Sequence, residues 1–299
     1  MLCISKSQFV GFFIGENFKI EHLQDVLPNY KYNPHPDHPN MIMRYSVESK
    51  NDVTEGDFTV DYGDHWYRGY RKFRRFNWIP NTDKYVFIDL NYGIYLESLD
   101  AMKYDVTYEY VSDYKISGNH ILVIQAMEAT KYKLYIIDVG RKIYRPASFP
   151  TRLMIHDIKL FQYANGNYYI VLVHQDSKTC LWTTTATTFH FVNKMCFHNT
   201  TSASLESNFY LNKWVEGLIY TNLPLNATHL KTHRTTDDGR YWEIVKFKHL
   251  SLENDEPVEF NFELHDPNSV PRHFGFSDFQ YERYGDALQP YMTIDGGNS

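Results

Sequence analysis

Short runs of apolar residues recur along this chain and are separated by polar turns. The runs are rich in β-branched and aromatic side chains and are four to six residues long: Tyr85 to Leu90, Ile121 to Gln125, Leu134 to Asp138, Tyr168 to Val173 and Gly217 to Tyr220. Runs of this kind are typical of β-strands. A helical period with caps does not persist beyond about two turns anywhere. The pattern therefore predicts an all-β protein.

An eight-residue pattern, Thr-x-Asp-x-Gly-x-x-aromatic, recurs between these runs. Its clean copies are Thr59, Asp61, Gly63 and Trp66, then Thr235, Asp237, Gly239 and Trp242, and a third copy begins with Thr293, Asp295 and Gly297 before the chain ends at Ser299. This pattern is the Asp-box. Its Thr and Asp side chains can hydrogen bond backbone groups within a tight turn, and its Gly supplies a positive φ. Each copy therefore predicts a hairpin corner.

Imperfect copies fill the intervals between the clean ones. They lie near Gly15, at 98–102, at Asp138 and Gly140, and at 184–191, so that phase marks fall near 15, 63, 102, 140, 188, 239 and 297. Blades of a β-propeller, each a four-stranded sheet, need about 40–50 residues. The spacing therefore predicts a β-propeller with Asp-box hairpins over residues 1–299. The stretch 254–290 has several prolines and no clear alternation, which indicates an insertion between blades.

Composition narrows the classes of partner. The net charge of −6 comes without a basic tract, which argues against a nucleic-acid partner. No run of eighteen apolar residues is present, so we expect no membrane span in this chain. Two sequons, at Asn199 and Asn226, point to glycosylation and to the secretory route. We expect no cofactor.

Two groups of residues allow more than one interpretation. Cys180 and Cys196 flank one imperfect copy of the box; they are either two buried thiols, which we favour, or a pair bonded across a hairpin. His35, Asp37 and His38 could be drawn as a metal site, but prolines surround them and no fourth ligand lies at a suitable spacing, so we expect no metal. The basic run from Tyr67 to Arg75 is interpreted as a solvated blade edge.

The order of the motifs resembles the Vps10 domain, the luminal propeller of sortilin-type sorting receptors. The segment 33–39 (NPHPDHP) is similar to a His-Pro-x-His-Pro-Asp phrase of that family, and 58–66 (FTVDYGDHW) resembles its strand followed by a box. The segments 71–78, 111–123 and 134–149 are similar to the phrases that follow in the family. The likeness runs from about Phe9 to Ser299.

This resemblance implies a fold and a function. The family fold is a ten-bladed propeller, of which this chain would form an incomplete arc of roughly six blades, cut at both ends. The implied function is that of a receptor glycoprotein that binds peptide or protein cargo for vesicular transport between Golgi, endosome and cell surface. The domain would face the lumen, and the full-length receptor would add a membrane span. We therefore expect no enzymatic activity.

The resemblance also suggests a cargo site. Members of the family hold the C-terminal carboxylate of a peptide with an Arg just after the strand of one box. The matching place in this chain is the strand from Phe191 to Phe197, where Phe197 stands at the Arg position and Lys194 and His198 are the nearest basic residues. Phe191, Lys194, Phe197 and His198 are therefore the candidate cargo-binding residues.

Two alternatives stay open. The first is a propeller glycoside hydrolase of the sialidase type, which also carries Asp-boxes. It would need three arginines on a carboxylate and a Tyr–Glu pair, whereas the arginines here come in runs such as Arg68, Arg71, Arg74 and Arg75. The second is a secreted remnant without a receptor role. The cargo, the oligomeric state and the state of Cys180 and Cys196 are left open by the sequence.

Overall fold

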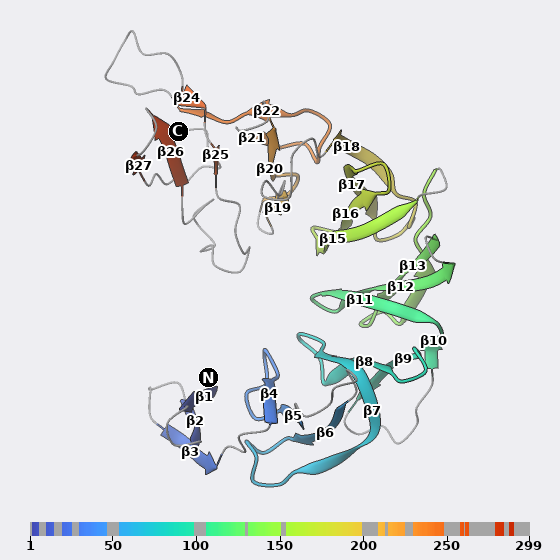
Figure 1. Ribbon diagram of the computed structural model, residues 1–299, viewed down its shortest axis with the longest axis vertical. Helices are drawn as coiled ribbons and strands as arrows, with labels where there is room; N and C mark the ends of the chain where they lie inside the picture. Colours follow the sequence, from blue (N-terminus) through green and yellow to red (C-terminus); the bar gives the residue numbers. More distant parts are fainter. Residues whose placement is uncertain are drawn as a thin grey trace. The chain divides into compact units, whose positions relative to one another are not determined.

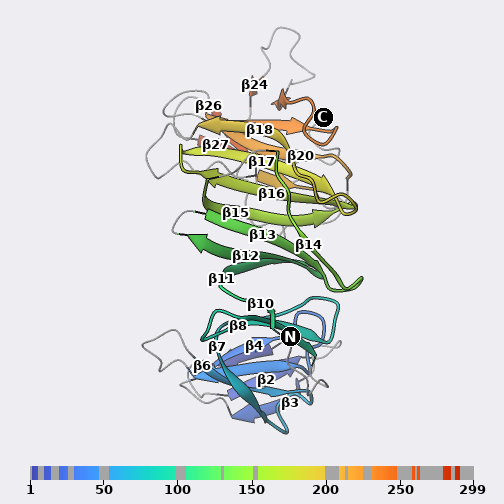
Figure 2. The same cartoon turned by 90° about the vertical axis from the view of Figure 1, so that its right-hand side faces the viewer.

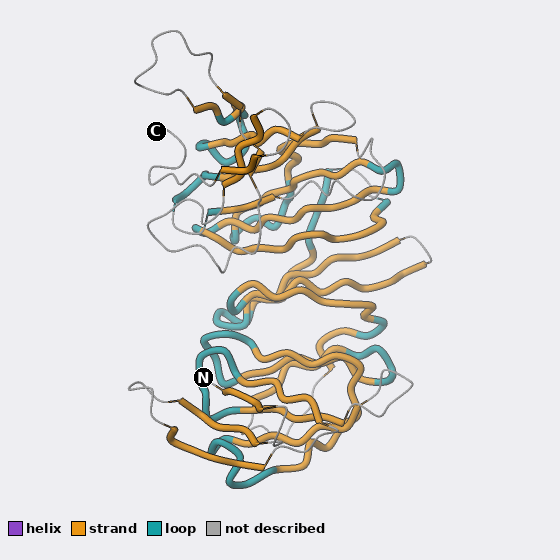
Figure 3. Tube along the Cα trace, turned by 60° about the vertical axis from the view of Figure 1, so that its left-hand side comes forward, coloured by secondary structure: helices purple, strands orange, loops and turns teal. Residues whose placement is uncertain are grey.

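The structure of the protein is a computed structural model (Figure 1), and Figure 3 shows its strands and connecting turns. It describes residues 2–5, 10–14, 20–25, 30–46, 54–98, 106–128, 131–150, 154–198, 209–212, 215–224, 230–247, 258–259, 261–262, 279–283 and 287–289. The chain divides into two compact units, Met1–Pro146 and Ala147–Ser299, which are considered separately below.

Unit 1 contains three antiparallel sheets. The first is β1 (Leu2–Ser5), β2 (Val10–Ile14) and β3 (Ile20–Asp25). The second joins seven strands: β4 (Tyr30–Pro34), β5 (Ile42–Ser46), β6 (Thr54–Thr59), β7 (Tyr67–Trp78), β8 (Lys84–Asp89), β9 (Ile94–Ser98) and β10 (Val106–Tyr108). The third is β11 (Val111–Ser117), β12 (His120–Glu128), β13 (Lys131–Asp138) and β14 (Ile143–Pro146). In each sheet the strands pair in the order in which they occur along the chain.

The seven-stranded sheet is two four-stranded sheets that share one strand. The first half of β7 pairs with β6, from Tyr67 opposite Phe58 to Phe73 opposite Thr54. The second half pairs with β8, from Phe73 opposite Asp89 to Trp78 opposite Tyr85. β7 is therefore the last strand of one sheet and the first strand of the next. Arg68, Lys72, Arg74 and Arg75 are exposed, whereas Phe73, Phe76 and Trp78 are buried. Each half of β7 pairs mainly on one side, which is consistent with the blade edge that the sequence predicts.

Unit 2 repeats the same arrangement. Its first sheet is β15 (Ile155–Ala164), β16 (Asn167–His174), β17 (Lys178–Thr185) and β18 (Val192–His198), which follow one another in Figure 2. The second is β19 (Phe209–Leu211), β20 (Ile219–Pro224), β21 (Leu230–Thr235) and β22 (Glu243–Ile244). Smaller sheets are formed by β23 (Lys246–Phe247) with β24 (Val258–Glu259), and by β25 (Asn261–Phe262), β26 (Phe279–Arg283) and β27 (Ala287–Gln289).

This architecture confirms the predicted fold class, an all-β protein of four-stranded antiparallel sheets of the propeller kind. The number of blades and the relation to a ten-bladed ring stay predictions. Phase marks 15, 102 and 297 lie outside the described residues. The predicted insertion at 254–290 is described only in β24 to β27, and nothing tests it as an insertion.

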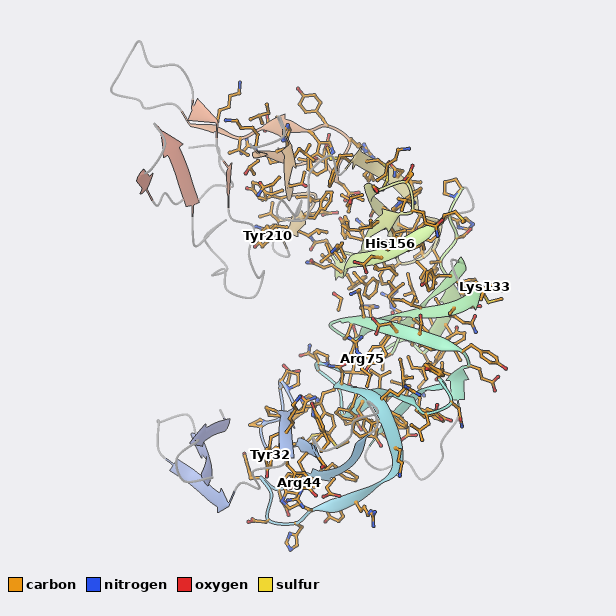
Figure 4. All side chains as sticks on the ribbon, viewed as in Figure 1. Tyr32, Arg44, Arg75, Lys133, His156 and Tyr210 are labelled. Carbon is orange, nitrogen blue, oxygen red and sulfur yellow. A yellow bond between two sulfur atoms is a disulfide. The ribbon has the colours of Figure 1, made fainter. Side chains whose placement is uncertain are left out.

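The first clean Asp-box forms the tight turn that its residues predict. The Thr59 hydroxyl donates to Asp61 Oδ1 (2.6 Å) and accepts from the backbone N–H of Gly63 (2.9 Å). Asp61 Oδ1 also accepts from His65 N–H (3.0 Å). Gly63 has a φ of 99°, which only glycine adopts readily. The half-buried Trp66 ring lies under the guanidinium of Arg44 at 3.9 Å and edge-on to Tyr32; both residues are labelled in Figure 4.

The second clean Asp-box has the same hydrogen bonds. Gly239 N–H donates to Thr235 Oγ1 (3.0 Å), and Asp237 Oδ1 accepts from two backbone N–H groups, those of Arg240 and Tyr241 (3.0 Å each). Gly239 has a φ of 81°. Both clean turns connect the third strand of a four-stranded sheet to the fourth.

The imperfect copies occupy the same place but differ in conformation. Asp138 accepts a hydrogen bond from Arg141 N–H (2.9 Å), yet Gly140 has no positive φ and Lys142 takes it instead, at 56°. In the copy at 184–191 it is Phe189 that has a positive φ, also 56°. Our expectation that the box Gly supplies the positive φ is therefore wrong for the copy with Gly140, since Lys142 turns the chain there; the copy at 184–191 has Thr188 in place of the Gly.

The core lies between neighbouring sheets. One cluster combines side chains of the β7–β10 and β11–β14 sheets: Ile79, Val86, Ile88, Ile94, Val111, Tyr114, Ile121, Val123, Ile137 and Val139. A second joins strands β5 to β9 through Met43, Phe73, Phe76, Trp78 and Phe87, among others. In unit 2, a third joins the β15–β18 and β19–β22 sheets through Tyr169, Val171, Leu181, Leu211 and Ile219. Burial of apolar area between sheets is the main source of stability here.

The His-Pro segment that precedes β5 connects two of these sheets. His35 is buried; its Nδ1 accepts from the backbone N–H groups of Asp37 (3.0 Å) and His38 (3.1 Å). Its Nε2 lies 2.9 Å from the carbonyl oxygen of Thr82, in the turn after β7, and donates to it. His35 also packs against Trp78, with ring centroids 5.2 Å apart. Both ring nitrogens are thus engaged with backbone groups, which fixes the neutral tautomer.

Two glycines allow the cost of a positive φ to be separated from the cost of steric crowding around an added Cβ. Gly239 and Gly166 have nearly the same φ, 81° and 80°. A Cβ on Gly239 would lie 3.1 Å from Lys194 Cβ, whereas a Cβ on Gly166 would meet nothing within 4 Å. We expect Gly166→Ala to lower the free energy of unfolding by about 1–2 kcal/mol through φ alone, and Gly239→Ala to lower it further. Equal losses in denaturant titrations would show that crowding at Gly239 is relieved without cost.

The protonation of His35 should make stability depend on pH. Burial, the largest cause, lowers the pKa of His35 below its usual value, so the folded state binds a proton less readily than the unfolded chain does. Its stabilising contribution is therefore complete above about pH 6.5 and declines as the pH falls below that value. Burial lowers the pKa values of His120 and His174 in the same direction.

The measurement is the free energy of unfolding of wild type and His35→Asn at about pH 7.5 and about pH 5.5. Asn retains an acceptor for the local N–H groups but does not titrate. We expect the variant to be less stable at the higher pH and to lose less stability between the two. An identical loss in both proteins would exclude His35 as the titrating group.

Candidate functional site

The predicted cargo-binding strand corresponds to β18, the fourth strand of its sheet. One edge of β18 pairs with β17, and the other has no strand partner among the described residues. β18 has seven residues, against three in β10, four in β14 and two in β22, the other fourth strands that pair on one side only among the described residues. It therefore offers the longest open edge of these four.

The two phenylalanines of the predicted site have different surroundings. Phe191 is only 1% exposed, and its ring stacks on that of Phe149, with centroids 4.9 Å apart. Phe191 thus belongs to the core, which corrects its assignment as a ligand contact. Phe197 is half-buried and packs against Phe209, with centroids 5.9 Å apart. His198 is the last residue of β18. Roles for Phe197 and His198 in binding stay predictions.

Lys194 already has an acidic partner. Its ammonium lies 3.3 Å from Asp238 Oδ2, and its side chain is only 15% exposed. The other oxygen of Asp238 accepts a 2.6 Å hydrogen bond from the Tyr169 hydroxyl. Burial, together with this bond, raises the pKa of Tyr169, so the hydroxyl keeps its proton as the donor.

This network connects β16, β18 and the turn after β21. Because Asp238 neutralises Lys194, the expectation that Lys194 replaces an Arg as partner of a cargo carboxylate needs revision. Tyr169 and Asp238 were not among the predicted site residues. Their contact joins positions 69 residues apart along the chain, and no local pattern in the sequence signals it.

A disulfide joins Cys180 of β17 to Cys196 of β18. The two residues are directly opposite in the strand register, with Cα atoms 4.1 Å apart. The interpretation favoured from sequence, two free thiols, is therefore wrong, because the pairing register places the two side chains next to each other. Cys180 is buried and Cys196 is exposed on the last strand. The bond fixes the edge strand to the rest of its sheet.

The backbone of β18 can accept another strand. A Cα separation as short as that of Cys180 and Cys196 is typical of a pair that exchanges no backbone hydrogen bonds, so the N–H and C=O of Cys196 point to the open edge. A register irregularity places Lys194 outside the pairing with β17. Val192, at the start of the strand, is 52% exposed. An extended peptide alongside β18 would find donors, acceptors and an apolar contact.

The remaining predicted residues are scaffold or lie outside the described part of the chain. Asp61, Gly63, Trp66, Asp138, Gly140, Asp237, Gly239 and Trp242 lie in or beside the turns between third and fourth strands. The glycosylation candidates Asn199 and Asn226, and the box residues Asp295 and Gly297, lie outside the described residues. Within the described ranges, no three His, Cys, Asp or Glu side chains are grouped as ligands for a metal ion. The same ranges hold no helix of sufficient length and apolar character to span a bilayer.

Comparison with known proteins supports the fold. No family model matches the sequence, and no curated protein matches it. Among solved structures, one from a study of two prolyl endopeptidases matches with a TM-score of 0.50 and 12% identity over 86% of this chain and 46% of that one. Oligopeptidase B from Trypanosoma brucei matches with a TM-score of 0.50 and 9% identity, covering 78% of this chain and 36% of that one. TolB from Acinetobacter baumannii matches with a TM-score of 0.37 and 11% identity, over 72% and 52%.

These matches correct one expectation. The chain spans less than half the length of the two peptidases that it matches with a TM-score of 0.50. Because both are peptidases by their titles, they contradict our expectation, drawn from the Vps10 resemblance, that the protein has no enzymatic activity. At such low identity the likeness establishes the fold, which is that of a β-propeller.

Proposed function

We propose that this chain is a peptide- or protein-binding propeller domain and that the open edge of β18 is its docking strand. The observation that carries the proposal is the seven-residue edge of β18, which a disulfide fixes to its sheet and which has no strand partner among the described residues. Addition of a strand to such an edge is a common mode of peptide recognition, in which main-chain hydrogen bonds supply affinity and side-chain contacts supply specificity.

The Vps10 resemblance extends this proposal to a biological role. A receptor of the sortilin type would use the domain to bind cargo peptides on the luminal side of Golgi, endosome or cell-surface membranes. The Cys180–Cys196 disulfide supports such a location, because structural disulfides form and persist in oxidising compartments. The ion pair between Lys194 and Asp238 favours recognition of the cargo backbone over recognition of its terminal carboxylate.

A second candidate is the propeller part of a peptidase. It is favoured by the two matches with a TM-score of 0.50, whose titles name prolyl endopeptidases and oligopeptidase B. Both candidate functions involve peptides as ligand or substrate. Hydrolysis of a fluorogenic proline-containing peptide by the full-length protein would favour the second.

Binding at a strand edge depends on alternate N–H groups of the peptide. We would select an extended peptide of about ten residues from an array and prepare two versions, N-methylated at the odd or at the even positions. Only one set of N–H groups can face β18, so we expect one version to lose at least about tenfold in affinity, or ~1.4 kcal/mol. The other should bind about as well as the parent in isothermal titration. Equal affinity of both versions would exclude pairing with a strand edge.

The disulfide should contribute measurably to stability. Cys180 and Cys196 are 16 residues apart in sequence, and closing a loop of that size stabilises a fold by about 3 kcal/mol in the chain-entropy description. We expect the double variant Cys180→Ala/Cys196→Ala to unfold at a clearly lower temperature in calorimetry. Cys3→Ala removes the third cysteine of the chain and serves as a control. Dithiothreitol should lower the unfolding temperature of wild type and of Cys3→Ala but leave that of the double variant unchanged. An unchanged wild type would contradict the role assigned to the bond.

A further inference from the structure

Arg74 and four exposed aromatic or apolar residues lie on segments that meet at the ends of strands in unit 1. Arg74 comes from β7, Leu90 and Tyr92 from the turn between β8 and β9, Tyr110 from the link between β10 and β11, and Met127 from the end of β12. Backbone hydrogen bonds connect these segments. Val111 N–H donates to the Tyr92 carbonyl (2.8 Å), and Ala126 N–H donates to the Tyr110 carbonyl (3.1 Å). We call these five residues the Arg74 surface.

Arg74 owes its position to a β-bulge. Phe73 pairs with Asp89 and Arg75 with Ile88, so Arg74 is the extra residue between them. Ser112 in β11 and His156 in β15 are extra residues at the same place of their own strands. The bulge therefore belongs to the repeat, and only the side chain that it presents is particular to each sheet. Bulges commonly redirect a side chain at the rim of a sheet.

The two tyrosines are held in an uncommon backbone conformation. Tyr92 has a φ of 61° and Tyr110 a φ of 57°, a region that bulky residues seldom adopt. The first turn is fixed by the buried carboxylate of Asp89, which accepts from the N–H groups of Asn91 (2.9 Å) and Gly93 (2.8 Å). Gln125 Nε2 donates to the carbonyl next to Tyr110, at 2.7 Å. Strained residues kept in place by their surroundings are concentrated at functional sites.

The side chains of the Arg74 surface are open to solvent despite this fixed backbone. The exposed fractions are 37% for Leu90, 46% for Tyr92, 69% for Tyr110 and 50% for Met127. These are four of the eleven large apolar side chains that are exposed in the described part of the chain. Tyr, Met and Arg are also residues enriched in protein interfaces, and these four lie on segments joined by backbone hydrogen bonds.

The positive charge of Arg74 indicates that the partner of this surface carries a negative charge. The Arg74 guanidinium lies over the Tyr92 ring, 4.4 Å from its centroid, and no carboxylate among the described residues forms an ion pair with it. The neighbouring Arg75, labelled in Figure 4, is instead neutralised by Asp113. Stacking on an aromatic ring leaves the fork of the guanidinium free for a carboxylate. Glu109, which is exposed and adjacent to Tyr110 in the sequence, adds a negative charge to the link between β10 and β11.

We infer that the Arg74 surface binds an acidic, extended segment of a partner protein in which an Asp or Glu lies next to an apolar or aromatic side chain. The carboxylate would pair with Arg74, and the neighbouring side chain would pack between Tyr92 and Tyr110, with Leu90 and Met127 at the margin. This inference does not rest on β18, which belongs to a different sheet.

The test starts from phage-displayed random dodecapeptides selected on the whole chain and counter-selected on Arg74→Ala. The enriched peptide is then titrated against wild type, Arg74→Ala, Arg74→Lys, Arg74→Glu, Tyr110→Ala and Tyr241→Ala. Tyr241 is a matched control, because its side chain is 70% exposed on the turn after β21. All of these side chains lie at the surface, so unfolding temperatures should stay within about a degree or two of wild type.

We expect enrichment of Asp or Glu beside an aromatic or apolar residue. Arg74→Ala should weaken binding about tenfold or more, Tyr110→Ala about fivefold, and Arg74→Lys less than Arg74→Ala. Arg74→Glu should favour a peptide with Lys in place of the acid, and Tyr241→Ala should bind like wild type. Peptides that show no acidic preference, or that lose equal affinity with Tyr241→Ala, would overturn the inference. So would a concentration-dependent dimer of the wild type that Tyr110→Ala abolishes, because the occupant would then be a second copy.

Loss of binding through N-methylation of the β18 peptide and loss through Arg74→Ala are separate readouts. A dodecapeptide that binds wild type and fails on Arg74→Ala supports the Arg74 surface even if no peptide pairs with β18. A peptide that tolerates Arg74→Ala but loses affinity on alternate N-methylation supports the edge of β18 and counts against the Arg74 surface.

Discussion

The two middle strands of the β15–β18 sheet are buried on both faces, and this constraint shows what the rest of the structure depends on. All six central residues of β16 are buried, as are the six that follow Lys178 in β17. A sheet of this kind has no solvated face of its own and is stable only against its neighbour, which is why the apolar clusters combine residues of adjacent sheets. Exposed polar side chains of such a sheet are therefore found mainly at turns, strand ends and edge strands.

The sequence predicts those parts of the fold that follow from local patterns. The runs at 85–90, 121–125, 134–138 and 168–173 fall on β8, β12, β13 and β16, since strands buried on both faces read as unbroken apolar runs. The two clean Asp-boxes likewise specify their turns, because Thr, Asp and Gly act within eight residues of one another. Edge strands such as β14 and β18 carry mixed polar and apolar residues and give a weaker signal.

Contacts between distant residues are what the sequence does not predict. The Lys194–Asp238–Tyr169 network depends on which strands become neighbours, and the Cys180–Cys196 bond depends on a register that a shift of one residue would destroy. The burial of Phe191 could not be distinguished from exposure, because an aromatic residue next to an edge strand is compatible with either. The Arg74 surface gathers residues from four segments, and no spacing along the chain indicates it.

The propeller scaffold allows several functions, and the matched peptidases show that it does not by itself separate a binding protein from an enzyme. What distinguishes this chain is the set of backbone and side-chain groups that are not needed for packing between the sheets. An edge strand fixed by a disulfide, and an arginine that lies on a bulge and stacks on Tyr92, are the two features that we propose for peptide binding, one through the backbone and the other through side chains. The two features belong to different sheets, so they can evolve and be altered independently.

β7 joins two sheets without an intervening loop, and this has a mechanical consequence. A hinge needs a few residues whose φ and ψ can change freely, whereas Phe73 is paired on one side with Thr54 and on the other with Asp89. The junction between the two sheets is therefore rigid at this point of β7. A displacement of the Asp-box corner at Gly63 is transmitted along the twelve residues of β7, past Arg74, to Trp78 and the loop held by His35. A force applied to either sheet is thus carried to the other by the strand itself.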